Sequence, residues 1–159
     1  MILTKNEGNL VDNFFDLKYS GIAHGCNCFS TMGRGIALEI KNRIPEAYAA
    51  DCQTVKGDIN KLGNYSIFES KYGFVANLYT QFTYWEEGVL IDWEALENAL
   101  TKLIEGRGGS TDHPLCIGVP YIGCGLAGGE ESDLIEVLEK VVVKFPTING
   151  CIELVRFNK

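Results

Sequence analysis

Two stretches of the sequence combine glycines with side chains that can carry out acid–base or nucleophilic chemistry. The first stretch, residues 24–37, begins with His24-Gly25-Cys26-Asn27-Cys28, and the second covers residues 121–129. His24 is the best candidate for catalysis, because an imidazole titrates near neutral pH and can act as an acid, a base or a nucleophile. A histidine at the end of a strand can equally hydrogen-bond a neighbouring carbonyl, so a structural role for His24 stays open.

The glycines of both stretches favour contact with phosphate. Glycine adopts backbone conformations closed to other residues and lets the main chain approach a ligand closely. Consecutive N–H groups in such a loop can converge on phosphate oxygens, helped by the dipole of the helix that follows. A simple tight turn is the alternative interpretation for either loop taken alone. The sequence Gly33-Arg34-Gly35-Ile36-Ala37-Leu38 does not complete GxGxxG, so the dinucleotide-dehydrogenase fingerprint is absent.

Hydrophobic periodicity predicts the elements that position these two loops. Apolar runs at residues 19–25 and 115–120 predict buried strands, each just before one of the loops. Ligands bind beyond the carboxyl ends of strands in open α/β sheets, so the two loops are expected to meet at one edge of the sheet. Other strands are expected near the N-terminus from Ile2, at residues 65–70 and 73–79 as a hairpin, and at 151–157. Helices are expected at residues 12–18, 35–44 and 46–53, after a cap at Asp92, and from a cap at Ser132 through Lys144.

This alternation of strands and helices predicts the fold class. A chain of 159 residues fits one domain, so residues 1–159 are expected to form a single α/β unit. Because only one pair of strands is predicted as a hairpin, we expect a mixed sheet with helices on both faces, a three-layer α/β/α arrangement. A monomer is expected.

Composition excludes several classes of function. The net charge of −7 and the absence of a basic run argue against binding of bulk nucleic acid. The sequence has no apolar run of membrane-spanning length and no signal peptide, so we expect a cytoplasmic protein. The six cysteines are expected to be free, buried thiols. With two histidines and no paired CxxC, neither a metal site nor a cofactor is expected.

The motifs taken together resemble the macrodomain family. His24-Gly25-Cys26-Asn27-Cys28, residues 32–37 and Arg43-Ile44-Pro45-Glu46-Ala47-Tyr48 follow one another as they do in that family, and residues 120–129 resemble its phosphate-binding loop. Glu7-Gly8-Asn9-Leu10 occupies the place of the family's early Gly-Asp-[Ile/Leu] turn. The resemblance spans nearly the whole chain and is greatest to the branch of small ADP-ribose 1″-phosphate phosphatases and terminal ADP-ribose–glutamate hydrolases.

The resemblance implies a role for each matching position. His24 and Asn27 would be catalytic, with Asn27 also holding the distal ribose. Asn9 and Leu10 would contact the adenine, which Phe157 or Asn158 would flank. An asparagine at position 9, where the family more often has aspartate, would give a weaker contact because it carries no charge. The remaining positions expected to bind the substrate are Cys26, Met32, Gly33, Gly35, Ile36, Tyr121, Ile122, Gly123, Cys124, Gly125 and Leu126.

Departures from the family decide between its activities. The hydrolases of this branch carry a lysine after the central strand and an aspartate after the second loop, whereas this chain has Tyr79-Thr80-Gln81-Phe82 and Ala127 there. The resemblance therefore implies a phosphatase that converts ADP-ribose 1″-phosphate to ADP-ribose and phosphate. The alternatives are a non-catalytic reader of ADP-ribose and a hydrolase that removes ADP-ribose from its carrier.

Overall fold

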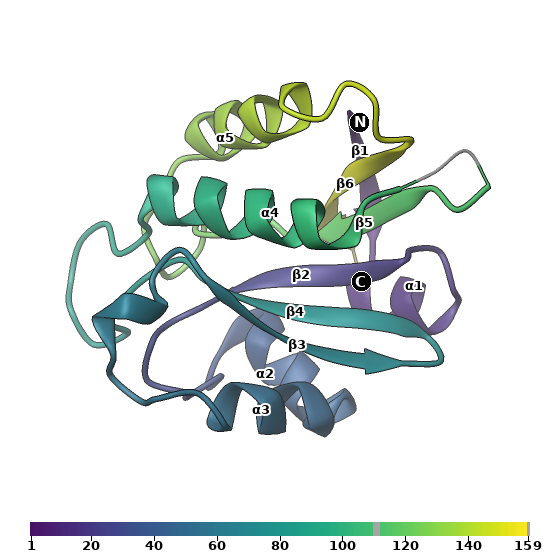
Figure 1. The fold of residues 1–159 in the computed structure, drawn as a ribbon. Helices are drawn as coiled ribbons and strands as arrows, with labels where there is room; N and C mark the ends of the chain where they lie inside the picture. Colours follow the sequence, from purple (N-terminus) through teal and green to yellow (C-terminus); the bar gives the residue numbers. More distant parts are fainter. Residues whose placement is uncertain (110–111, 159) are drawn as a thin grey trace.

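A computed structural model of the chain describes residues 1–109 and 112–158, in six strands, five α-helices and a short 3₁₀ helix (Figure 1). The elements in chain order are β1 (Ile2–Gly8), α1 (Leu10–Phe15), β2 (Gly21–Cys26), α2 (Gly35–Arg43), α3 (Pro45–Cys52), η1 (Ile59–Lys61), β3 (Tyr65–Ser70), β4 (Gly73–Tyr79), α4 (Trp93–Arg107), β5 (Leu115–Val119), α5 (Glu131–Val143) and β6 (Gly150–Phe157).

The strands form one mixed sheet in the order β1-β6-β5-β2-β4-β3. All neighbouring strands pair in parallel except β3, which lies antiparallel to β4 at the edge. The hairpin of β3 and β4 has the bounds that the sequence predicts. Because the five other strands run in one direction, their carboxyl ends all lie at the same edge of the sheet.

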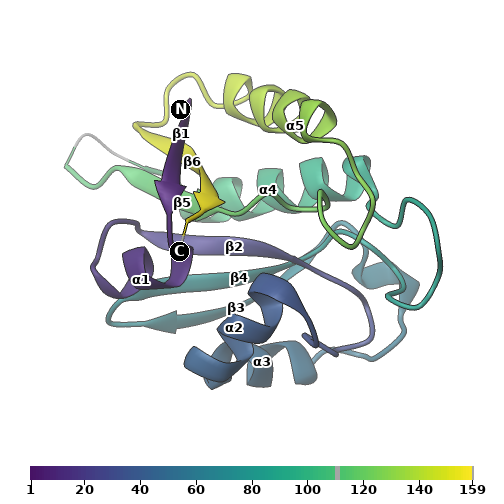
Figure 2. The same cartoon turned by 180° about the vertical axis from the view of Figure 1, so that it is seen from behind.

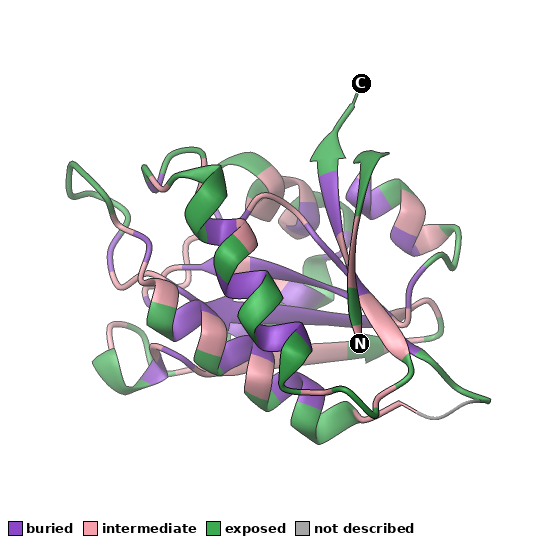
Figure 3. Cartoon of the chain, turned by 90° about the horizontal axis from the view of Figure 1, so that it is seen from above, coloured by how far each residue is buried: buried purple, intermediate pink, exposed green. Residues whose placement is uncertain are grey.

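Helices cover both faces of the sheet, as the alternating pattern predicts (Figures 1 and 2). On one face α4 and α5 pack against each other and bury leucine, valine and isoleucine side chains. On the other face α2 and α3 pack on β2, β3 and β4, and α1 lies beside them. The view in Figure 3 shows the inward sides of α4 and α5 buried and their outward sides exposed. The expected three-layer α/β/α arrangement is confirmed.

Two helix starts differ from those that the sequence predicts. Helix α1 begins at Leu10 rather than Asp12, because Asn9 is the cap: its Oδ1 atom accepts a hydrogen bond from the N–H of Asp12. Helix α5 begins at Glu131 after an extended Glu130, so Ser132 lies inside the first turn and does not cap it. The expected cap at Asp92 is confirmed, since its carboxylate accepts from the N–H of Ala95 at 3.0 Å.

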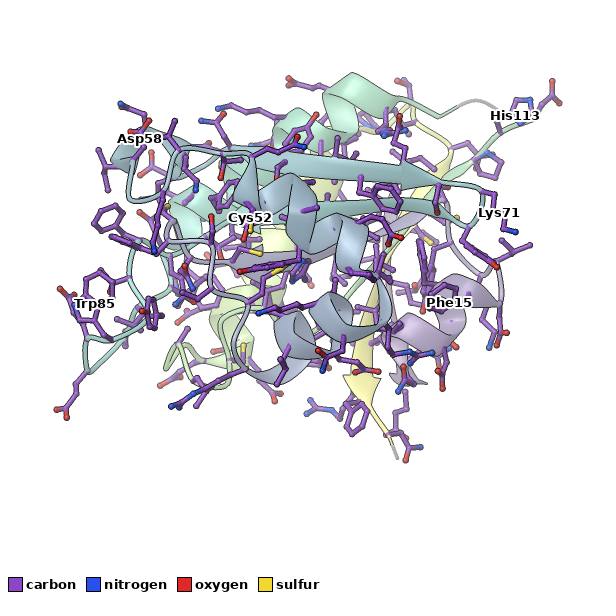
Figure 4. The ribbon with its side chains drawn as sticks, turned by 90° about the horizontal axis from the view of Figure 1, so that it is seen from below. Phe15, Cys52, Asp58, Lys71, Trp85 and His113 are labelled. Atoms are coloured by element: carbon purple, nitrogen blue, oxygen red, sulfur yellow. The ribbon has the colours of Figure 1, made fainter. Side chains whose placement is uncertain are left out.

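The thiols differ in exposure from what the sequence predicts. Only Cys26 and Cys28 are buried, and Cys52, labelled in Figure 4 on helix α3, is exposed. Cys52 lies at the end of α3 between Asp51, which is buried, and Gln53, so the helix turns its thiol to the outside. Within residues 1–109 and 112–158, no helix is long and apolar enough to cross a membrane.

Candidate functional site

Three loops follow the carboxyl ends of β2, β4 and β5 and enclose a cavity of about 950 Å³. Loop one is residues 27–34, loop two is residues 120–130 and loop three is residues 80–92. The cavity is at the upper end of the size range of ligand pockets. The two glycine-bearing loops that the sequence singles out therefore meet at one edge of the sheet. The predicted site residues that line this cavity are Cys26, Asn27, Met32, Gly33, Gly35, Ile36, Tyr121, Ile122, Gly123, Gly125 and Leu126.

A second cavity of about 650 Å³ adjoins the first, where β1 and β6 end. The two cavities share part of their walls, so they form one continuous trough along the carboxyl edge of the sheet. The shared residues are Gly35, Ile36, Pro120, Tyr121 and Gly125. Leu10 and Cys124, two further predicted site residues, line the second cavity only.

Loop two presents unpaired N–H groups to the first cavity. Within the described residues, the N–H groups of Gly123, Gly125 and Leu126 have no hydrogen-bond acceptor. Gly123 has a φ of +78°, and a Cβ atom there would lie 2.6 Å from Cγ1 of Ile91, so this position requires glycine. A Cβ atom at Gly125 would meet nothing within 4 Å. Gly123 is half-buried, whereas Gly125 and Leu126 are exposed. Main-chain N–H groups of successive loop residues that have no acceptor in the protein are a feature of anion sites built from the main chain.

The N-terminus of α2 faces the same cavity. Gly35 and Ile36, the first two residues of the helix, line it, and the first N–H groups of a helix have no acceptor within the helix. The helix dipole places partial positive charge at this end. Arg34, the residue before the helix, is the one cationic side chain among the described residues of this cavity. Together with loop two, this arrangement suits a phosphate or diphosphate.

Loop one is held in a strained conformation by its own side chains. Asn27 Oδ1 accepts from the N–H of Phe29 at 2.8 Å, and its Nδ2 donates to Thr31 Oγ1 at 2.7 Å. Ser30 and Met32 have φ values of 55° and 42°, which cost energy in a residue with a side chain. Asn27 thus lines the cavity while its amide orders the loop, and its predicted contact with a ribose stays a prediction.

Hydrogen bonds connect loop one to α3 and to η1. Ser30 donates to the main-chain carbonyl of Asp51, and Lys61 Nζ donates to the carbonyl of Cys28 at 3.1 Å. Asp51 is 1% exposed and accepts from the hydroxyl of Tyr79 at 2.7 Å. Burial raises the pKa of Asp51, while the Tyr79 hydroxyl and the charge of Lys61 act in the opposite direction. No sequence motif indicated Asp51 or Lys61, because charged residues on a short helix and a turn are usually solvated.

Loop three forms the third wall and connects the other two. The ring of Phe29 in loop one lies 5.1 Å from that of Phe82 and 4.7 Å from that of Trp85, measured between centroids. On its other side, the N–H of Leu90 donates to the carbonyl of Ala127 in loop two. From the sequence, the carboxylates of Glu86 and Glu87 are expected close to the site, and Tyr84 is a candidate to line it, but no motif gives any residue of loop three a specific role. The structure places all three in the lining of the first cavity.

His24 lines neither cavity, although its ring lies 3.7 Å from Sγ of Cys26, which lines the first. Its ring is completely buried, and Nε2 lies 2.7 Å from Oδ1 of Asn77. Because Nδ2 of Asn77 donates to the carbonyl of Ala47 and to Ser66, the imidazole must donate from Nε2. Burial lowers the pKa of His24 to about 4, with the Asn77 hydrogen bond opposing that shift, so the ring is neutral at pH 7. A catalytic role for His24 stays a prediction.

The end of the trough where adenine is expected differs from the family pattern. Asn9 lines neither cavity: its Oδ1 atom caps α1, and its Nδ2 lies 3.4 Å from Oε1 of Glu39. Glu39 itself lines the second cavity, as do Leu10 and the largely exposed Phe157. Asn158 does not line it. Glu39 lies on α2, far from Asn9 in the sequence. The packing of α1 against α2 brings its carboxylate next to Asn9 and into the lining of the second cavity, where the sequence predicts Asn9.

No cluster of metal-ligating side chains occurs in the part of the chain that the structure describes. The charges that line the first cavity are the side chains of Arg34, Asp51, Glu86 and Glu87. The first cavity therefore offers main-chain donors, one guanidinium and three carboxyl groups to a ligand.

Comparison with known proteins places this geometry in a family. No protein-family model matches the chain. The chain is 38% identical over 141 residues, 86% of each protein, to an uncharacterised 17.5 kDa protein from the tk-vs intergenic region of Enterobacteria phage T4.

Solved structures of the same fold are more distant in sequence. The macrodomain of Mycobacterium tuberculosis DarG matches with a TM-score of 0.72 at 19% identity, over 96% of this chain and 97% of that one. Thermosipho africanus DarTG, solved in complex with ADP-ribose, matches with a TM-score of 0.72 at 18% identity, over 97% of this chain and 42% of that one. A macrodomain mutant from Oceanobacillus iheyensis matches with a TM-score of 0.69 at 17% identity, over 99% and 85%. The chain therefore has the macrodomain fold and belongs to the same family as the phage T4 protein.

Proposed function

We propose that this chain binds ADP-ribose along the trough, with the diphosphate between loop two and the N-terminus of α2. The observation that carries this proposal is the convergence of unpaired main-chain N–H groups from Gly123, Gly125 and Leu126 with the start of a helix. A diphosphate held by neutral donors does not need a basic protein, which agrees with a net charge of −7. Thermosipho DarTG, which shares the fold, was solved with ADP-ribose.

The second cavity supports adenosine as the other half of the ligand. Leu10 and Phe157 supply apolar surface for a purine ring, and the Glu39 carboxylate supplies an acceptor for its amino group. The distal ribose would then lie in the first cavity beside Asn27. This direction of the ligand follows from the order of the two cavities along the trough.

Calorimetric titration with ADP-ribose tests the binding. Gly125→Ala tests the diphosphate position specifically, because the added Cβ enters open space at the proposed diphosphate and disturbs no protein atom. We expect its affinity for ADP-ribose to fall about tenfold, equivalent to one lost hydrogen bond to a charged group. Gly106→Ala, the same exchange in α4 and outside both cavities, is the matched control. Absence of binding at millimolar ADP-ribose would end the proposal.

For the chemistry at the distal end, the first candidate is hydrolysis of ADP-ribose 1″-phosphate to ADP-ribose and phosphate. Arg34 beside the first cavity can pair with a terminal phosphate, and Asn27 can orient the ribose that carries it. His24 would act as the acid–base group of the predicted mechanism. Phosphate released from the purified protein measures the activity, and Arg34→Gln should reduce it at least tenfold.

The second candidate is recognition of ADP-ribose without turnover. The burial of His24 favours it, because a neutral ring that lines neither cavity and lies behind Cys26 is poorly placed for attack on a phosphate. Tight calorimetric binding without phosphate release would support this candidate. Phosphate release that is lost in His24→Gln, with ADP-ribose affinity retained, would support the first.

A further inference from the structure

The mouth of the first cavity has an unusual surface, made by Tyr84, Trp85, Glu86 and Glu87 of loop three together with Leu126 of loop two. All five residues line the cavity. Tyr84, Trp85 and Leu126 expose 54%, 56% and 70% of their surface. Figure 4 shows Trp85 at one end of the molecule, opposite His113. Exposed apolar side chains that gather at the rim of a cavity commonly mark a surface for recognition.

The aromatic part of the mouth is held in place before any ligand binds. The Trp85 ring packs edge-on against Phe29 at 4.7 Å and against Tyr84 at 5.1 Å. Phe29 belongs to loop one, so the mouth is connected to the wall that carries Asn27. A preorganised aromatic side chain loses little conformational freedom when a ligand covers it. Trp85 therefore offers a fixed π surface beside the place expected for the distal ribose.

The charge of the mouth is acidic. Glu86 and Glu87 lie next to Trp85 and make no ion pair with any described residue. Deeper in the same cavity, the Oδ2 atom of Asp51 has no hydrogen-bond partner within the described residues. Aromatic faces beside carboxylates attract cations, and a guanidinium group satisfies both, because it stacks on rings and pairs with carboxylates. The phosphates of a nucleic acid would be repelled by the same carboxylates.

The position of the mouth shows which part of the ligand it meets. No residue of loop three lines the second cavity, so the mouth lies at the end of the trough away from the proposed adenine. At that end the ligand presents its distal ribose, and a group joined to that ribose would leave the cavity by the mouth that Trp85 and Leu126 help to form. A first cavity of about 950 Å³ leaves room for such a group.

We propose that this mouth recognises ADP-ribose carried on the arginine side chain of a polypeptide. This inference rests on the proposed binding of ADP-ribose and does not require turnover. The guanidinium that bears the distal ribose stacks on Trp85, and Glu86 and Glu87 neutralise its charge and that of neighbouring basic residues. The carrier is thus a cationic peptide, and nucleic acid as a carrier is disfavoured.

Three probes separate this inference from the proposed function. Free ADP-ribose measures occupation of the trough alone. A short basic peptide with one ADP-ribosylated arginine adds the cationic carrier, and a single-stranded oligonucleotide with one ADP-ribosylated base adds an anionic carrier. Affinities are measured with the whole chain at low and at high salt. We expect the peptide to bind about fivefold or more tightly than free ADP-ribose, an advantage typical of a partly desolvated cation–π contact.

The informative quantity is the ratio of the peptide affinity to the free ADP-ribose affinity. In the double variant Glu86→Gln/Glu87→Gln this ratio should fall to about one, and for the wild type it should decrease as salt screens the carboxylates. Glu136→Gln/Glu139→Gln, an equal loss of charge on the exposed side of α5, should leave the ratio as in the wild type. Trp85→Leu should lower the ratio and Trp85→Phe should retain part of it.

The outcomes are distinct. If free ADP-ribose does not bind, the proposed function fails, and the inference fails with it. If free ADP-ribose binds but the peptide binds no more tightly, the inference alone is wrong. If the oligonucleotide gains affinity instead of the peptide, the mouth recognises nucleic acid and the cationic carrier is excluded.

Discussion

Nε2 of His24 on β2 and Oδ1 of Asn77 on β4 lie 2.7 Å apart, and both side chains are completely buried. These residues are register partners in the parallel pair of strands. Asn77 is fixed in turn by its bonds to the carbonyl of Ala47 and to Ser66, so the pair connects the sheet to α3. This hydrogen-bond chain makes the stability of the fold depend on the protonation state of one imidazole.

The buried histidine predicts a specific pH dependence of stability. The pKa of His24 is about 4 in the folded chain and near 6.5 when the chain unfolds, so the unfolded state binds the proton first. The contribution of neutral His24 to the free energy of unfolding is complete above about pH 6.5. It is lost as the pH falls from there through 4, and the total loss is roughly 3 kcal/mol. Urea unfolding between pH 7 and pH 4 measures it. His24→Gln should show a shallower decline over that range, and an equally steep decline in the variant would contradict the assignment.

The acceptor at the second cavity predicts a preference among purines. If Glu39 accepts a hydrogen bond from the adenine amino group, the hypoxanthine analogue of ADP-ribose should bind about tenfold more weakly, because its oxygen faces a carboxylate. Competition titrations with the two ligands give the ratio. In Glu39→Gln the ratio should shrink, since the amide can donate to that oxygen. Glu97→Gln, on α4 and outside both cavities, is the control. Equal affinities in the wild type would remove Glu39 from the site.

Two nearby glycines of loop two predict different effects of an alanine exchange on stability. Gly123→Ala places a methyl group 2.6 Å from Ile91 in a backbone with φ of +78°, so we expect a loss of roughly 1–3 kcal/mol in the free energy of unfolding. In Gly125→Ala the added Cβ meets no atom within 4 Å, so the free energy of unfolding should stay within about 0.5 kcal/mol of the wild-type value. Thermal unfolding of both variants checks the contrast. A stable Gly123→Ala would show that loop two can adopt another course.

Replacement of the buried Lys61 is expected to lower the stability of the fold by an amount that depends on pH. Lys61→Met removes the bond to the carbonyl of Cys28 and the cation near Asp51, and leaves the buried carboxyl with the hydrogen bond from Tyr79 but no nearby positive charge. We expect a loss of about 3 kcal/mol near neutral pH. Because burial already raises the pKa of Asp51 and the variant raises it further, the stability lost through this carboxyl grows as the pH rises. The difference from the wild type should therefore narrow toward pH 4. A difference independent of pH would mean that Asp51 does not sense Lys61.

Much of the fold follows from local sequence. The hairpin of Tyr65–Ser70 and Gly73–Tyr79 is predicted because alternation of apolar residues breaks at one short turn, and the cap at Asp92 is predicted because aspartate before an apolar helix is a strong signal. That the two glycine loops share an edge also follows, since parallel strands have their carboxyl ends on one side. The starts of α1 and α5 were missed by one or two residues, because several polar residues near each start can serve as the cap.

The rest of the site depends on contacts between residues distant in sequence. Glu39 comes to the second cavity only because α2 packs beside α1, and Asp51 lies under loop one only because α3 turns back along β4. The orientation of His24 could not be predicted, since β2 is buried on both faces and its alternation carries no information. The sequence indicates the carboxylates and aromatic rings of loop three as neighbours of the site, but it assigns them no role, because they belong to no motif.

The placement of all three loops at one edge has a practical consequence. The opposite end of the molecule, where Lys71 lies in the β3–β4 turn and His113 precedes β5, touches neither cavity (Figure 4). A dye or a surface linker attached at position 71 would leave the trough open from end to end. Immobilised in that orientation, the protein would present Trp85 outward, so that binding of modified peptides at the mouth can be tested on a surface.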